Sequence, residues 1–126
     1  MEGPAEEPVI RITAMPADAN SYGDIFGGWL LSLMDMGAGL IASRCSRGRA
    51  VTVAMDGAQF HLPVKVGDEV SVYGHLVRTG RTSMVIATET WRRHRDEEEE
   101  IKVTEAQFTF VAVDATGRPR AVQEEK

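Results

Sequence analysis

The segment GDIFGGWLLSLMDMGAGLIASR, residues 23–44, is a stretch of this chain in which apolar residues recur with helical spacing. Intervals of three and four residues place these side chains on one face of an α-helix. We therefore predict one long helix from about Gly27 to Arg44, whose apolar face must be buried against the rest of the chain. The residues on this face are Leu30, Leu33, Met34, Gly37 and Ile41.

The rest of the chain has the two-residue alternation that is typical of β-strands. Several of its runs are roughly 10–13 residues long, against about 5–6 for an average strand. One long helix and long antiparallel strands favour an α+β fold in which a strongly curved sheet wraps around the helix. The helix covers one face, so the other face must meet solvent or another copy of the protein. The expected strands are residues 9–13, 49–60, 68–79, 82–95 and 101–114.

Length and composition indicate one ordinary globular domain. The 126 residues suit a single core, and we expect it to span residues 9–122 between tails at 1–8 and 123–126. No apolar run approaches the ~20 residues that cross a bilayer, and the acidic N-terminus does not resemble a secretion signal. Cys45 is the one cysteine, which excludes an internal disulfide framework. We therefore expect a cytoplasmic protein with no membrane partner.

The net charge of -5 argues against nucleic acid as a partner. It still allows a local basic patch to hold an anionic ligand. The three histidines, His61, His75 and His94, have no spacing that suggests a metal site. We therefore expect no metal.

Glycine and aspartate are both unusual inside the predicted helix. Gly27 and Gly28 stand at its start, although glycine costs about 1 kcal/mol relative to alanine in a helix. They either let another part of the chain approach closely or leave first-turn N–H groups free to polarise an oxyanion. Asp35 has small neighbours that leave room beside its carboxylate. The alternative is that Asp35 simply faces solvent.

The loop before the helix supplies a second polar candidate. Asn20 either closes an Asx-turn or directs its carboxamide donor at a carbonyl group. Asp24 is expected to favour the positive end of the helix dipole. Tyr22 and Phe26 are expected to pack rather than to take part in chemistry.

The motifs MPADAN, GDIFGGW, MD, VTV, PVKVGD and FTFVAVD occur in this order along the chain. Together they resemble the YciA-like acyl-CoA thioesterases of the hot-dog superfamily, relatives of the cytosolic acyl-CoA hydrolases of animals. The resemblance covers about residues 9–122. It implies a hot-dog fold and hydrolysis of acyl-CoA in fatty acid metabolism. It also implies a homodimer with one continuous sheet, usually assembled into a homohexamer that is a trimer of dimers, with active sites between the two protomers of a dimer.

The same resemblance assigns roles to individual residues. Asp35 matches the family's helix aspartate, a general base or nucleophile, and Asn20 matches a loop asparagine that the partner protomer supplies. Tyr22 departs from the pattern, because relatives often have Asn or His there. The acidic run DEEEE, residues 96–100, also departs from it and replaces a less acidic hairpin loop.

Thioester hydrolysis needs donors for the developing oxyanion and a base or nucleophile on the opposite side. We expect the Asn20 carboxamide and the N–H near Gly28, beside Gly27, to polarise the carbonyl. Asp35 then activates water or attacks to form an anhydride; the sequence favours neither. No cofactor is expected, because coenzyme A enters as part of the substrate.

Basic side chains are expected to hold the phosphates of coenzyme A. Hydroxyl groups are expected to contact its pantetheine arm or to orient Asp35, although Thr52 could instead be a β-branched strand residue with no such role. Two alternatives to a thioesterase stay open, a non-catalytic acyl-CoA sensor and a hot-dog hydratase. The residues expected to contact coenzyme A are Arg44, Arg47, Arg49, Arg81, Thr52, Thr82 and Ser83.

Overall fold

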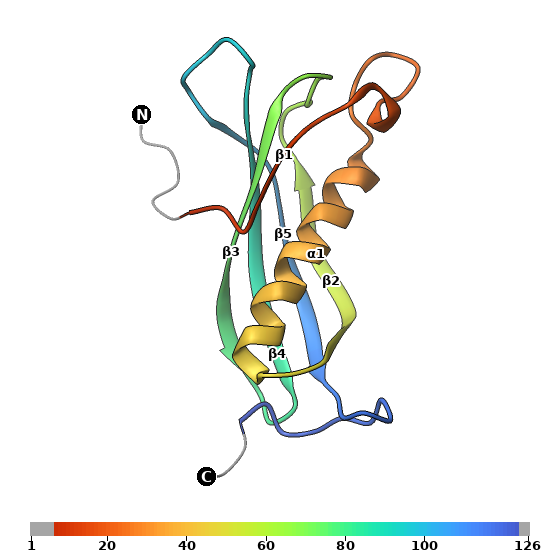
Figure 1. Ribbon diagram of the computed structural model, residues 1–126, viewed down its shortest axis with the longest axis vertical. Coiled ribbons are helices and arrows are strands. Elements are labelled where there is room, and N and C mark those ends of the chain that lie inside the picture. Colours follow the sequence, from red (N-terminus) through yellow and green to blue (C-terminus); the bar gives the residue numbers. More distant parts are fainter. Residues whose placement is uncertain (1–6, 124–126) are drawn as a thin grey trace.

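A computed structural model of the chain describes residues 7–123. Residues 1–6 and 124–126, which make up most of the two predicted tails, lie outside the described part. One long helix crosses a five-stranded sheet (Figure 1). In chain order the elements are β1 (Ile10–Thr13), a 3-10 helix η1 (Pro16–Asp18), α1 (Gly27–Ser46), β2 (Ala50–Phe60), β3 (Glu69–Thr79), β4 (Ser83–Arg93) and β5 (Ile101–Ala112).

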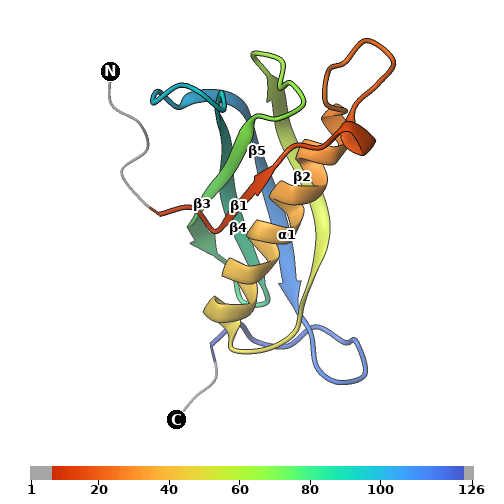
Figure 2. The same ribbon diagram turned by 45° about the horizontal axis from the view of Figure 1, so that its top comes forward.

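The sheet is antiparallel throughout, with the strand order β1-β3-β4-β5-β2. Strands β2 to β5 are 11 or 12 residues long, and β1 covers only the first part of β3. The sheet curves around α1 (Figures 1 and 2). The predicted α+β architecture is therefore confirmed, and so are the five predicted strands within a few residues at their ends. The short 3-10 helix was not predicted.

Helix α1 begins at the predicted Gly27 and continues two residues past the predicted Arg44, to Ser46. Arg47 ends it by adopting the left-handed conformation, with φ of 56°. The Gly48 N–H then bonds back to the Ser43 carbonyl at 3.1 Å, which is the usual way to satisfy the last carbonyls of a helix. The sequence gives no sign that Arg47, which is not a glycine, adopts the left-handed conformation. The predicted helix therefore ended two residues too early.

The predicted apolar face of α1 is the face that meets the sheet. Leu30, Leu33, Met34 and Gly37 are buried, and Ile41 is half-buried. They pack against inward-facing side chains of β3, β4 and β5. The largest of these sheet residues are Val70, Val72, Met84, Ile86, Phe108 and Phe110.

Strand β2 is an edge strand and is exposed along almost its whole length. Its register against β5 shifts between Thr52 and Ala54 and again between Asp56 and Gln59. Val53 is 56% exposed. Because an exposed apolar edge strand is a template for pairing with another chain, this side of the domain is suited to a second copy. The large apolar side chains exposed on β2 and the neighbouring part of α1 are Met36, Leu40, Val51, Val53, Met55 and Phe60.

The loop before α1 differs from its prediction. Tyr22 and Phe26 were expected to pack, yet they are 87% and 53% exposed. No described element covers them in a single chain, because the loop extends past the first turn of α1 (Figure 2). Within residues 7–123, no helix is both long enough and apolar enough to cross a membrane.

Substitution of two helix glycines, Gly37 and Gly39, by alanine should affect stability differently. A Cβ added at Gly37 would lie 2.8 Å from Val9 Cγ1 and 3.3 Å from Val72 Cγ1. Gly37→Ala should therefore destabilise the fold by about 1–3 kcal/mol through overpacking. A Cβ at Gly39 would meet only Phe110, at 3.5 Å, so Gly39→Ala should be neutral or gain up to about 1 kcal/mol from helix propensity. Chemical denaturation at one protein concentration compares the two; equal stabilities would contradict the packing argument.

Candidate active site

Asp35 lies on the side of α1 that faces the edge strand β2. It is half-buried, and its Oδ1 accepts a hydrogen bond of 2.6 Å from the Thr52 hydroxyl. That length is typical of a hydroxyl donating to an ionised carboxylate. Asp35 therefore does not simply face solvent: Thr52 fixes one carboxylate oxygen and leaves the other free of any side-chain partner among the described residues. The expected orienting contact from Thr52 is present.

The two glycines that open α1 differ in their surroundings. A Cβ at Gly27 would lie 3.0 Å from the Phe60 ring, whereas one at Gly28 would meet nothing within 4 Å. Close packing thus explains Gly27, and open space distinguishes Gly28. The close-packing explanation is confirmed for Gly27, and the oxyanion role of Gly28 stays a prediction.

The first turn of α1 has no side-chain cap, and its N-cap residue is Phe26. The N–H groups of Trp29 and Leu30 bond to the Phe26 carbonyl at 3.1 and 3.3 Å. Within residues 7–123 no acceptor is found for the N–H groups of Gly27 and Gly28. Uncapped N–H groups at the positive end of a helix form a site for an anion or a developing oxyanion.

Asn20 closes an Asx-turn, which was one of the two alternatives for it. Its Oδ1 accepts hydrogen bonds from the N–H groups of Tyr22, at 2.8 Å, and Asp24, at 3.1 Å. These two bonds occupy both lone pairs of the carboxamide oxygen and fix the plane of the amide. The NH2 group consequently keeps a defined direction, and it makes no side-chain bond within the described part of the chain. A structural role and a donor role are compatible here.

Asp24 does not lie in the first turn of α1, where its negative charge would interact favourably with the helix dipole. That turn contains no acidic residue. Asp24 instead forms an ion pair with Lys65, so the predicted dipole role is wrong.

One protomer does not bring these groups to a common point. Seven residues separate Gly28 from Asp35, which places them on the same side of α1 but about 10 Å apart along its axis. Asn20 lies between η1 and α1, in the loop that Figure 1 shows beyond the N-terminal end of the helix. Groups that act on the same carbonyl must approach it to about 3 Å. Within one chain, Asp35 and Gly28 therefore lie too far apart to act together on one carbonyl.

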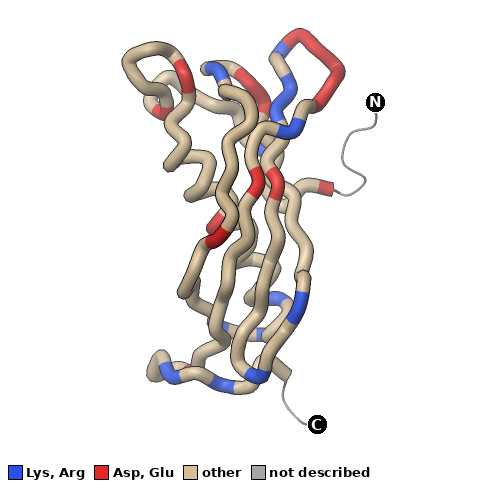
Figure 3. The backbone as a smooth tube through the Cα atoms, turned by 180° about the vertical axis from the view of Figure 1, so that it is seen from behind, with Lys and Arg blue, Asp and Glu red and all other residues tan. Residues whose placement is uncertain are grey.

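Charge is distributed unevenly along the domain (Figure 3). Arginines gather where α1 ends, where β3 turns into β4 and after β5, while acidic and basic residues lie together at the opposite end, where Lys65 pairs with Asp24 and Arg93 with Glu69. A hollow of about 880 Å³ lies at the basic end. Its charged lining residues are Arg44, Arg47, Arg49, Arg120 and Asp114.

The other residues expected to contact coenzyme A lie at the same end but outside this hollow. Arg81 and Thr82 lie in the turn between β3 and β4, and Ser83 is the first residue of β4. The carbonyls of Arg81 and Thr82 accept hydrogen bonds of 2.9 and 2.8 Å from the N–H groups of Val122 and Ala112. The turn therefore packs against the segment that follows β5.

Arg120 is the basic residue of the hollow that the sequence prediction missed. The motif GRPR at residues 117–120 was a signal for it. Its placement beside the end of α1 depends on topology rather than on local pattern.

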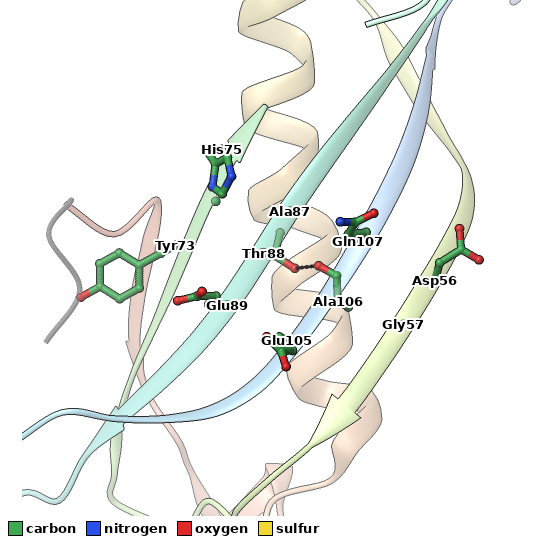
Figure 4. Close-up of a pocket in the computed structure, with 11 residues that line it drawn as sticks. Asp56, Gly57, Tyr73, His75, Ala87, Thr88, Glu89, Glu105, Ala106 and Gln107 are labelled. Atoms are coloured by element: carbon green, nitrogen blue, oxygen red, sulfur yellow. Dashed lines mark hydrogen bonds between the residues drawn. The ribbon is translucent and has the colours of Figure 1, made fainter. Parts of the chain in front are cut away.

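A second hollow, of about 460 Å³, lies on the face of the sheet that points away from α1 (Figure 4). Two of its acidic groups, Glu89 and Glu105, are already paired. Lys102 bonds to Glu105 at 3.0 Å and lies 3.7 Å from Glu89. Hydrogen bonds from Lys102 and His61 lower the pKa of Glu105. None of the predicted site residues lines this hollow, so it is not the candidate site.

Comparisons with known proteins place the chain among thioesterases. Residues 22–99 match the family model described as "Thioesterase superfamily". An uncharacterised acyl-CoA thioester hydrolase of Zymomonas mobilis is 55% identical over 116 residues, covering 92% of this chain and 78% of that protein.

The acyl-CoA thioester hydrolase YciA of Escherichia coli is 47% identical over 122 residues, covering 94% of this chain and 92% of that protein. The solved structure of a hexameric thioesterase from Yersinia pestis has a TM-score of 0.91 and 46% sequence identity. The match covers 97% of this chain and 99% of that chain.

The hollow lined by Arg44, Arg47, Arg49 and Arg120, called the arginine hollow below, should bind multivalent phosphate anions. We expect inorganic pyrophosphate to bind there, with an affinity that falls as salt is added, because salt screens exposed charges. Arg49→Gln and Arg120→Gln should each weaken binding about three- to tenfold through loss of a charge-assisted contact. Isothermal titration measures this, with Lys102→Gln on the far face as control. Unchanged binding in both arginine variants would contradict the assignment.

Proposed function

The chain belongs to the thioesterase superfamily, among its YciA-like acyl-CoA thioester hydrolases, and we propose that it hydrolyses acyl-CoA to a free acid and coenzyme A. One observation carries the chemical part of this proposal. The Asp35 carboxylate is held by Thr52 on the open side of α1, where a second copy can bring polarising donors. A carboxylate with one fixed and one available oxygen suits a base or a nucleophile.

Each protomer contributes different groups to one site. Asp35 comes from one chain, while the Asn20 carboxamide and the N–H of Gly28 come from its partner. The antiparallel arrangement of two α1 helices would bring the first turn of one beside Asp35 of the other. The roughly 10 Å between Gly28 and Asp35 in one chain supports this division.

Hydrolysis proceeds at the thioester carbonyl. Asn20 and Gly28 donate to the carbonyl oxygen and stabilise the oxyanion. In one route Asp35 takes a proton from water as that water adds to the carbonyl carbon, the C–S bond breaks, and the proton passes to the departing thiolate. In the other route Asp35 adds to the carbonyl carbon, the thiolate leaves, and water opens the resulting anhydride. Neither route requires a cofactor.

A basic hollow and an apolar hollow at opposite ends of α1 orient the substrate along the domain. The arginine hollow suits the phosphates of coenzyme A, with Arg81, Thr82 and Ser83 nearby. An apolar hollow of about 370 Å³ lies at the opposite end of α1 and suits the acyl chain. Its lining includes Ile25, Gly27, Leu30, Phe60, Leu62 and Val64.

Oligomer formation completes the site in this proposal. Pairing of two β2 edges gives a homodimer with one continuous sheet and covers the exposed apolar residues of β2. Three dimers then form a hexamer, the state of the Yersinia pestis thioesterase. Closed symmetric assembly is the usual solution for such an interface.

Substitution of the proposed catalytic pair tests the activity. Wild-type protein should release coenzyme A thiol from an acyl-CoA. Asp35→Ala should lower kcat by at least about 100-fold, and Asn20→Ala by about 10- to 1000-fold. Thr52→Val should lower kcat about tenfold, because a hydrogen bond to a charged group is lost. A thiol-reactive dye follows the reaction, with Thr52→Ser and thermal unfolding as controls.

Three outcomes of this assay separate the alternatives. Tight acyl-CoA binding without thiol release would indicate a sensor. Full activity of Asp35→Ala would overturn the residue assignment while leaving the activity intact. If activity is lost only in variants that also unfold, the loss assigns no role to the substituted residues. Comparison of Thr52→Val with Thr52→Ser, which keeps the hydroxyl, then decides whether the Thr52–Asp35 hydrogen bond is needed.

Mixed assemblies test the shared site. Asp35→Ala and Asn20→Ala chains, unfolded and refolded together, should regain about a quarter of wild-type activity, because half of random dimers are mixed and each holds one intact site of two. Differently tagged chains allow the mixed dimers to be isolated and assayed. No recovery in isolated mixed dimers would contradict a site built from two chains.

A further inference from the structure

We propose that Lys65 is a positioning residue for the reaction: its ion pair with Asp24 sets the direction of the Asn20 carboxamide. This inference rests on the proposed function, in which that carboxamide polarises the substrate carbonyl. Lys65 belongs to the loop between β2 and β3, a segment that contains none of the predicted catalytic residues. The argument follows a chain of contacts from Asn20 back to the sheet.

Asn20 is joined to Asp24 by main-chain and side-chain bonds. The Asn20 N–H bonds to the Asp24 carbonyl at 2.7 Å, and Asn20 Oδ1 accepts from the Asp24 N–H at 3.1 Å. The plane of the carboxamide is therefore determined by where the Asp24 backbone lies. A small tilt of Asp24 rotates the NH2 group that faces the neighbouring chain.

Asp24 is in turn held by Lys65. The two residues form an isolated antiparallel bridge, and the Lys65 ammonium group donates a hydrogen bond to Asp24 Oδ1. Next to them, the Ile25 N–H bonds to the Val64 carbonyl at 2.8 Å. The loop that carries Asn20 is thus attached along one side to residues 64–65.

Lys65 itself is fixed by a buried carboxylate. Asp68 is 3% exposed, and its Oδ2 accepts the Lys65 N–H at 3.0 Å. The other oxygen of Asp68 lies 2.7 Å from His94 Nδ1, at the end of β4. Because a buried carboxylate is costly unless its bonds are made, this side of the contact is rigid. The Asn20 loop is the side that can move.

The Asn20 loop is closed at its base by the Phe26 N–H bond to the Asp18 carbonyl at 3.0 Å, and its tip is held by one short-range main-chain bond, from the Gly23 N–H to the Asn20 carbonyl at 3.1 Å. Tyr22 is 87% exposed, and Gly23 adopts a φ of 87°. The ion pair is itself exposed, with 53% of the Lys65 side chain and 38% of the Asp24 side chain accessible. Exposed pairs contribute little to folding free energy. Loss of this pair should therefore change orientation, and hence kcat, more than stability.

Steady-state kinetics of Lys65 variants test the inference. Lys65→Met should lower kcat about three- to fivefold with KM changed less than about twofold, while the unfolding temperature stays unchanged. Lys65→Arg should restore most of kcat, and Asp24→Asn should match Lys65→Met. Lys102→Met is the matched control, because Lys102 also forms ion pairs at the surface, with Glu89 and Glu105 on the outer face of the sheet. A change in KM alone would overturn the inference and indicate direct substrate contact.

A double variant shows whether Lys65 acts through Asn20. In an Asn20→Ala background, Lys65→Met should cause no further decrease in kcat. The same three- to fivefold decrease in both backgrounds would overturn the inference. Full activity of Asn20→Ala alone would overturn both the inference and the proposed role of Asn20.

Mixed dimers separate the inference from the shared-site proposal. The intact site combines Asn20 from an Asp35→Ala chain with Asp35 from an Asn20→Ala chain. Lys65→Met should lower activity when placed in the first chain and have no effect in the second. Equal effects in both chains would overturn the role of Lys65. If mixing restores no activity, the shared site fails, and the double variant still decides on Lys65.

Discussion

Burial of one face of α1 is the constraint on which the rest of this structure depends. A single helix has to cover a sheet whose four long strands have 11 or 12 residues each, so the sheet curves until Leu30, Leu33 and Met34 are enclosed. The curvature brings β3, β4 and β5 around the helix. It leaves β2 with one bonded side and one open side. The open side is where Asp35 and Thr52 meet.

Packing and function therefore divide α1 between them. Gly37 permits the closest approach of the helix to Val9 and Val72 and belongs to the core. Gly28 has open space around it and belongs to the proposed site. Asp35 lies between these two regions, beside the edge strand β2, which pairs with β5 on one side and, in the described part of the chain, has no strand on the other. A structure that buried every face of this helix would have no room for a substrate.

Periodicity was sufficient to predict the helix, the long strands and the curved sheet, because each depends on local pattern. The resemblance to thioesterases added the roles of Asp35 and Asn20, which local pattern left open. Contacts between distant segments were beyond both. The pairing of Asp24 with Lys65 replaces the predicted dipole role, and Arg120 reaches the basic hollow only because the chain turns back after β5. Such contacts depend on which loops meet, and one sequence does not encode that in any short window.

The register shifts in β2 have a consequence for how this strand can change over evolution. Thr52 lies opposite Phe110 and Met55 opposite Phe108, so two residues three positions apart both face the helix. In a regular strand they would face opposite sides. Deletion of one residue between Thr52 and Met55 would turn the following side chains of β2 to the opposite face of the sheet. Thr52 and the later residues of β2 would then no longer share the inner face. Substitutions are therefore easier to accommodate at this edge than insertions or deletions, whereas residues 95–99 lie outside the paired strands, so a change of length there would shift no register.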